Sequence, residues 1–119
     1  SFNKVGHLSQ LFLLTLRTSN LNLEIQTGRH RDKLLSERLC RFCEKMGDIV
    51  IEDEFHFLLS CEMYSELRKT LLPCITQRKV NFDLFIELMS TTDVHIVRQL
   101  AVFVYKGFVL RKKRLLDLV

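Results

Sequence analysis

Apolar residues recur at helical spacing along most of this 119-residue chain. The first stripe predicts an amphipathic helix over residues 5–18 and consists of Leu8, Leu11, Phe12, Thr15 and Leu16. A second stripe predicts a helix that starts at Asp53 or Glu54 and ends at Pro73; its members are Phe55, Leu58, Leu59, Tyr64, Leu67, Leu71 and Leu72. These long stripes favour an all-α fold.

Two further helices are expected in the C-terminal part, over about residues 81–118. Asn81 is placed to cap a short helix through Met89, and Thr92 or Asp93 opens the longest one, from Val94 to about Leu118. The inward face of the longest helix should hold Ile96, Val97, Leu100, Val104, Phe108 and Leu115. Residues 21–26 alternate between apolar and polar, which suits a short extended piece or a loosely helical link.

The composition fits a globular protein, with 47% hydrophobic and 27% charged residues. The length predicts a single domain over residues 1–119. Neither a signal peptide nor a membrane-spanning run is recognised, so we expect an intracellular protein without a membrane partner. The nucleus is the compartment we expect for it. In that setting cysteines serve as metal ligands more often than as disulfide partners.

Three of the four cysteines lie with one histidine in the pattern C-x2-C-x12-H-x4-C, formed by Cys40, Cys43, His56 and Cys61. A C-x2-C pair on a tight turn can point two sulfurs at one ion, and the His and Cys lie just over one helical turn apart at a helix start. Three thiolates and an imidazole form the tetrahedral shell that Zn²⁺ prefers. The sequence therefore predicts a zinc cofactor.

The predicted zinc centre is structural, because four protein ligands leave no position for a catalytic water. Ile49–Ile51 is β-branched and favours a short hairpin leading back to the next helix. Cys74 lies outside the ligand set. The predicted fold is a small all-α domain with a CCHC zinc-stapled turn or short β-hairpin inserted before a central helix, the zinc module spanning about residues 36–72.

Charge is unevenly distributed along the chain. Residues 1–41 carry seven Lys and Arg against three acids, residues 42–66 one against seven, and residues 67–119 ten against four. The basic flanks could bind nucleic-acid phosphates; the candidates are Arg29, Arg31, Lys33, Arg38, Arg41, Arg111, Lys112, Lys113 and Arg114. Equally, these side chains could be solvated, and the last run could complement its helix dipole. Phe42 could stack on a base or pack under the zinc.

A second hypothesis is a protein-interaction or assembly module. The acidic middle of the chain would repel phosphate, whereas Phe103, Tyr105, Phe108 and Val109 leave apolar side chains on more than one face of the last helix. Such a helix could bind a protein partner or form a homodimer, or it could be a central core helix. An enzyme is not expected, because Glu52, Asp53 and Glu54 are consecutive and do not share a face.

The residues around the zinc pattern also carry a family resemblance. The segment IEDEFHFLLSCEMYSELR (51–68), together with the C-x2-C pair, resembles the zinc-binding region C-terminal to the reverse transcriptase domain of non-LTR retrotransposons. The lead-in LRTSNLNLEIQTGR (16–29) is similar to that family too. The resemblance covers about residues 8–70 and implies the same four zinc ligands, nucleic-acid handling and retrotransposon origin. The interval between Cys43 and His56 is longer than in the compact family form, and no polymerase or endonuclease motif is present.

Overall fold

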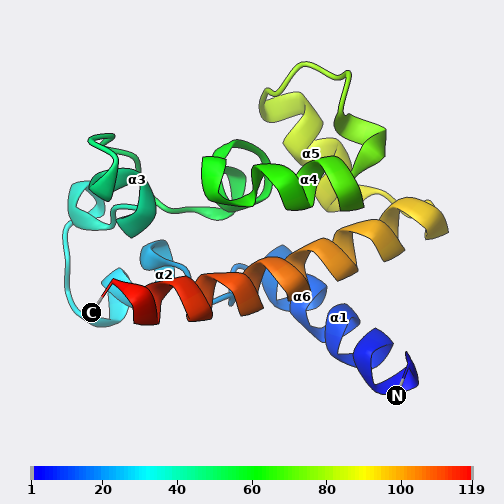
Figure 1. The fold of residues 1–119 in the computed structure, drawn as a ribbon, viewed down its shortest axis with the longest axis horizontal. Coiled ribbons are helices and arrows are strands. Elements are labelled where there is room, and N and C mark those ends of the chain that lie inside the picture. Colours follow the sequence, from blue (N-terminus) through cyan, green and yellow to red (C-terminus); the bar gives the residue numbers. More distant parts are fainter. Residues whose placement is uncertain (1, 119) are drawn as a thin grey trace.

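The computed structural model describes residues 2–118, with side chains from residue 6 onward. Within that range the fold is all-helical, as predicted, and contains no strand. The chain order of its helices is α1 (Phe2–Arg17), α2 (Glu24–His30), η1 (Leu35–Glu37), α3 (Arg41–Lys45), η2 (His56–Ser60), η3 (Glu62–Tyr64), α4 (Ser65–Leu71), η4 (Pro73–Ile75), α5 (Phe82–Ser90) and α6 (Val94–Asp117). Figure 1 shows α6 crossing the molecule, with α4 and α5 on one side and α1 on the other.

The core forms where α6 packs against α1 and α4. Phe57, Tyr64 and Phe103 make a fully buried aromatic cluster, with ring centroids 4.8 Å apart for Phe57 and Tyr64 and 5.8 Å apart for Phe57 and Phe103. Gly107 lets α6 come this close, because a Cβ atom there would lie 3.0 Å from the ring of Phe57. Burial of each aromatic ring stabilises the fold by about 1.5–3 kcal/mol.

Helix α5 is held at both ends. Asn81 caps its start through a 2.9 Å hydrogen bond from the Leu84 N–H, as predicted from the sequence. At its other end Arg17 of α1 donates to the carbonyl oxygens of Leu88 and Thr91 at 3.1 and 3.2 Å. A cation at a helix C-terminus complements the helix dipole, so α1 and α5 stabilise each other.

Residues 24–30 form the helix α2, although the alternation over residues 21–26 left an extended piece open. The helix forms because its first N–H groups find partners in Glu52: Glu24 N donates to Oε1 at 2.7 Å and Ile25 N to the carbonyl oxygen at 3.0 Å. Gly28 permits the close packing of Arg38, whose side chain occupies the space that a Cβ atom at position 28 would need. These partners come from distant positions, which a local pattern does not reveal.

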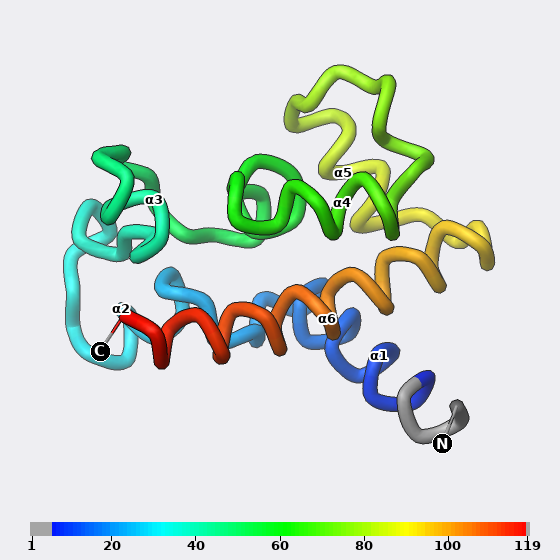
Figure 2. The backbone as a smooth tube through the Cα atoms, viewed as in Figure 1, coloured from blue at the N-terminus to red at the C-terminus, as the bar shows by residue number. Residues whose placement is uncertain are grey.

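The helix predicted from Asp53 or Glu54 to Leu72 is interrupted. Asp53 does cap its start, accepting from His56 N at 2.8 Å. A π-helical turn follows, and Cys61 then takes an extended conformation (φ −67°, ψ 125°) before η3 and α4 begin. The predicted hairpin is reduced to one antiparallel bridge between Leu39 and Ile51. Figure 2 traces the segment between α3 and the π-helical turn, residues 46–55, as it folds back beside α3.

Candidate metal centre

The C-x2-C pair lies on a compact turn. Cys40 precedes α3, and the backbone N–H groups of Glu44 and Asp48 donate to the carbonyls of Cys40 and Cys43 at 3.0 and 2.8 Å. Gly47 has φ +93°, a conformation that favours glycine and that turns the chain back. Cys40 N then donates to Val50 O at 2.7 Å. The turn thus holds both sulfurs on one side of the loop.

The π-helical turn η2 explains how His56 and Cys61 come together. In an α-helix two residues five positions apart point about 140° apart around the axis. Here Cys61 N donates to His56 O at 2.8 Å, a wider i to i+5 turn. This turn returns residue 61 over residue 56. The H-x4-C spacing and the π-helical turn are therefore two aspects of one feature.

Four candidate ligand atoms converge, all within 4.8 Å of one another. The Sγ atoms of Cys40 and Cys61 are 3.9 Å apart, as are those of Cys43 and Cys61, and Cys43 Sγ lies 3.4 Å from His56 Nε2. A tetrahedral centre with metal–sulfur bonds of ~2.3 Å has sulfur–sulfur edges of about 3.8 Å. All four residues are buried. The cluster therefore fits a tetrahedral metal ion.

The three thiols titrate differently. A hydrogen bond with Cys61 lowers the pKa of the Cys40 thiol to about 4, against the effect of burial. Burial, reinforced by repulsion from Cys40, raises the pKa of Cys43 to about 11. The contact with Cys40 and burial together raise the pKa of Cys61. Three thiolates so close together need a positive charge, which a divalent cation supplies.

Polar neighbours orient the π-helical turn. His56 Nδ1 lies 3.3 Å from Ser60 Oγ, so a proton on Nδ1 can be donated to the hydroxyl while Nε2 keeps its lone pair for a metal. From α4, Arg68 donates to the carbonyl oxygens of Leu58, Phe57 and Cys61 at 2.8, 3.3 and 2.8 Å. Burial lowers the pKa of Arg68. The guanidinium thus satisfies carbonyls at the end of the turn.

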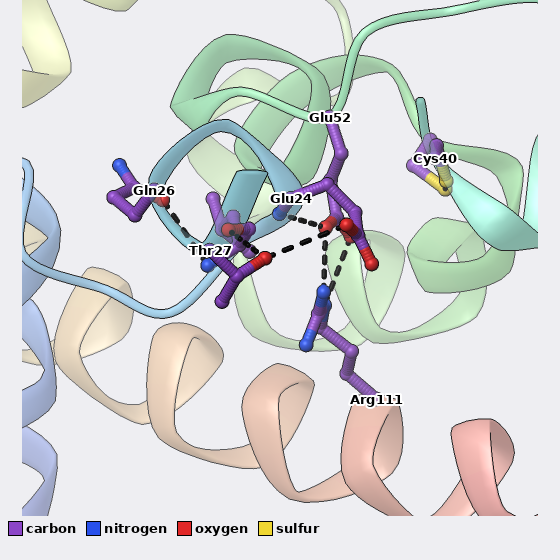
Figure 3. A network of polar contacts seen from close by, with 8 residues as sticks. Glu24, Gln26, Thr27, Cys40, Glu52 and Arg111 are labelled. Atoms are coloured by element: carbon purple, nitrogen blue, oxygen red, sulfur yellow. Dashed lines mark hydrogen bonds and ion pairs between the residues drawn. The ribbon is translucent and has the colours of Figure 1, made fainter. Parts of the chain in front are cut away.

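A buried ion pair joins the metal loop to α6. Arg111 donates through Nε and Nη2 to the Glu52 carboxylate at 2.9 and 2.6 Å. Only 5% of Arg111 and 1% of Glu52 is exposed. Burial opposes the charge of Arg111, but the hydrogen bonds and attraction of Glu52 raise its pKa. Figure 3 shows the Glu52 carboxylate between Arg111 and the start of α2.

The predicted basic run at the end of α6 is divided by the helix. Arg111 is engaged in the core, so we withdraw it from the candidate phosphate contacts. Lys112 and Lys113 are exposed, and Lys112 lies over the Phe108 ring at 5.3 Å. Arg114 lines a cavity with Phe42 and Cys43. The four basic residues of this run therefore lie in three different environments: the core, the exposed surface and the rim of a cavity.

Of the candidate residues from the N-terminal part, Arg31, Lys33 and Arg41 line one cavity beside α3. Arg29, Arg31 and Arg41 are exposed, and Lys33 is half-buried. Arg38 is half-buried, and its guanidinium donates to the carbonyls of Lys33 and Ile25, which makes it a structural clamp on α2.

Three neighbouring cavities link these cations to the end of α6. Arg31, Lys33 and Arg41 line the first, of about 260 Å³; Arg41 and Lys45 line the second, of about 300 Å³. Lys45 and Arg114 line the third, of about 530 Å³. Acidic side chains line the same cavities: Glu24, Glu37, Glu44, Glu62 and Asp117. Cations from residues 31–45 and from the end of α6 therefore line adjoining cavities, the third of which Cys43 and Cys61 also line.

Two remaining sequence candidates are also placed. Phe42 is half-buried, packs against the core and lines the third cavity. Cys74 lies outside the ligand cluster. Sequence reasoning did not assign Glu52 or Arg68 to the site, because their partners are backbone groups and a side chain far away in the sequence.

Comparison with models of protein families, with curated proteins and with solved structures gave no match for this chain. None of the helices in the described chain combines the length and apolarity that crossing a bilayer requires.

Proposed function

We propose that Cys40, Cys43, His56 and Cys61 hold a Zn²⁺ ion. The set of three sulfurs and one imidazole nitrogen suits this borderline-soft ion, and the 3.9 Å sulfur separations fit its tetrahedral shell. The ion supplies a positive charge that holds three thiolates together. It would fasten the C-x2-C turn to the π-helical turn.

In this proposal the metal is structural and the domain is not an enzyme. Four protein donors fill a tetrahedral shell, so no position remains for an activated water. All four residues are buried, although Cys43 and Cys61 also line the third cavity. Ser60, Arg68 and Asp53 orient the ligands through hydrogen bonds to His56 and Cys61, and none of the three is assigned a chemical step.

The second part of the proposal is that the zinc-stapled domain binds nucleic acid. A single observation supports it: adjoining cavities around α3 are lined by cations from residues 31–45 and from the end of α6, namely Arg31, Lys33, Arg41, Lys45 and Arg114. Arginines at such a rim can bind phosphates bidentately. The neighbouring glutamates confine the contact to a few positions, so the affinity should depend on individual arginines.

We further propose that the domain derives from the region C-terminal to a non-LTR retrotransposon reverse transcriptase, and that it acts in the nucleus. Two residues of the segment that carries the resemblance have clear structural roles. Tyr64 packs against Phe57 in the core, and Arg68 donates to the carbonyl oxygen of Leu58 in the π-helical turn. The bend at Gly47 lies within the interval that is longer than in the compact family form.

The zinc assignment is tested by elemental analysis of protein purified without chelator. We expect about one zinc per chain, its loss in Cys61→Ser, and its retention in the matched variant Cys74→Ser. Equal zinc in wild type and Cys61→Ser would disprove the assigned ligand set. Zinc loss in both variants would show that a ligand has been assigned wrongly.

Binding of nucleic acid is tested separately, with labelled single-stranded and duplex DNA and RNA over a range of salt concentrations. Arg31→Ala, Lys33→Ala and Arg41→Ala combined should flatten the slope of log K against log salt by about two to three, since each lost phosphate contact removes 0.7–0.9. Lys69→Ala, Lys79→Ala and Arg98→Ala combined remove equal charge elsewhere and should leave more of the slope. Identical slopes in both triple variants would contradict the proposed site.

A further inference from the structure

The outer face of α6 exposes apolar side chains that take no part in the core. Val109 is 50% exposed and Leu116 74% exposed, while Val102 is half-buried. These three residues are seven positions apart, which is close to two helical turns. They therefore form one line about 21 Å long, and we call it the outer strip.

Lysines border the outer strip on both edges. Lys106 and Lys113 each follow a strip residue by four positions and lie along one edge, and Lys112 follows Val109 by three and lies along the other. All three are exposed. Over residues 94–117 the sequence has six Lys and Arg but one acid, Asp117, which pairs with Arg114 at 3.8 Å. Among the described residues, none of these three lysines takes part in an ion pair.

We propose that the outer strip is a docking surface for an acidic amphipathic helix of a partner protein. Apolar positions every seven residues are the pattern that a second helix matches, and the lysine edges would pair with glutamates that flank the partner's apolar line. The lysines thus favour an acidic partner, and the apolar side chains of the strip would be buried against the partner's apolar line.

Other occupants match the strip less well. A second copy would bring an equally basic strip against it. Nucleic acid would pair with the lysines, but its phosphates would not bury the apolar side chains of Val102, Val109 and Leu116. A lipid surface takes up a wide apolar face, and in α6 the wide apolar face is already packed against α1 and α4.

This docking surface is separate from the one proposed for nucleic acid. The cations near the metal cluster include Arg114, which turns toward the third cavity, whereas Lys106 and Lys113 border the outer strip. The two proposals can therefore fail independently.

The probe is a designed helical peptide of about three heptads with leucines in a heptad line and glutamates at the flanking positions. Its control is the same peptide with lysine for each glutamate. Titration of the zinc-loaded full chain, followed by fluorescence anisotropy, should show at least about tenfold tighter binding of the acidic peptide. Added salt should weaken that binding.

Two sets of variants test the surface itself. Val109→Asp combined with Leu116→Asp should weaken binding of the acidic peptide at least about tenfold. The matched control is Ile86→Asp on α5, which replaces a side chain equally exposed at 50% and should bind like wild type. Lys106→Glu combined with Lys113→Glu should reverse the preference toward the lysine peptide, and circular dichroism should show unchanged helicity throughout.

The proposal is overturned if the acidic peptide fails to bind, if Ile86→Asp weakens binding as much as the strip variant, or if charge reversal leaves the preference unchanged. A dimer in sedimentation equilibrium that the strip variant dissociates would assign the strip to a second copy. Loss of DNA or phosphatidylglycerol-vesicle binding in the strip variant, with peptide binding intact, would assign it to those surfaces.

Discussion

The carboxylate of Glu52 accepts hydrogen bonds from two segments that lie far from it in the sequence. One oxygen receives the first N–H of α2, and both receive the guanidinium of Arg111. Removing one partner of a buried ion pair leaves the other charged and desolvated, which typically costs about 3–5 kcal/mol. The two charges are therefore more consequential for the fold than any exposed pair, such as Lys69 with Glu66.

Replacing Arg111 tests this directly. Arg111→Met should lower the free energy of unfolding in urea by about 3–5 kcal/mol, because Glu52 keeps its burial but loses its cation. The neighbouring Lys113→Met removes the same charge from an exposed position and should change stability by less than about 0.5 kcal/mol. Comparable losses in the two variants would show that the buried pair contributes little.

Tyr64 presents the opposite case. Its ring belongs to the aromatic cluster, yet its buried hydroxyl has no hydrogen-bond partner among the described residues, and burial raises its pKa. An unsatisfied buried donor costs about 1–3 kcal/mol. Tyr64→Phe should therefore raise the melting temperature or leave it unchanged, whereas Tyr64→Leu should lower it by removing ring contacts. A marked loss of stability in Tyr64→Phe would reveal a partner for the hydroxyl.

At the scale of elements, the π-helical turn depends on α4. A wide turn between His56 and Cys61 leaves carbonyls beyond the reach of the usual helical ladder, and Arg68 satisfies three of them. A single side chain of α4 thus holds the backbone that positions two metal ligands.

Arg68→Met should consequently weaken zinc retention as well as the fold. We expect a loss of about 2–3 kcal/mol in unfolding free energy, because buried carbonyls lose charged donors, and faster zinc release to a colorimetric chelator. Lys69→Met, one position further on an exposed surface, provides the control and should match wild type in both assays. Unchanged zinc release in Arg68→Met would separate the guanidinium from the metal centre.

Elements whose cause is local could be predicted from the sequence. The periodicity of α1, α5 and α6 and the cap at Asn81 follow from neighbouring residues, and the structure confirms them. The ligand spacing likewise predicted which four side chains converge. The interruption at Cys61 could not be predicted, because the apolar stripe continues through it. The ion pair of Arg111 with Glu52 spans 59 positions, and nothing local distinguishes this arginine from Lys112 or Lys113.

At the scale of the whole molecule, side chains of the metal loop, residues 38–56, join it to α2 and α6. Glu52 accepts from Glu24 N and from Arg111, and Arg38 donates to Ile25 O. The ligand cluster would add a metal-centred link within this loop and to Cys61. Structural zinc in small domains contributes about 10–16 kcal/mol of apparent binding energy, as much as the whole net stability of a typical domain, about 5–15 kcal/mol.

Removal of metal should therefore unfold much of the chain. We expect EDTA or a stronger chelator to reduce the helical circular dichroism signal, and stoichiometric Zn²⁺ to restore it, while Mg²⁺ does not because it prefers oxygen ligands. Cys74→Ser should respond like wild type. A helical signal that survives complete zinc removal would show that the apolar core suffices for folding.

The bond between Glu52 and Arg111 also fixes the order in which a growing polypeptide can fold. All four metal ligands have been synthesised once Cys61 is added, but Arg111 follows fifty residues later. At about 5–20 residues per second the ribosome needs roughly 3–10 s to supply it. Throughout that interval Glu52 lacks its cation, so the buried ion pair that joins the loop to α6 cannot form. The nascent chain can bind its metal first, and the core is completed only when the end of α6 has emerged.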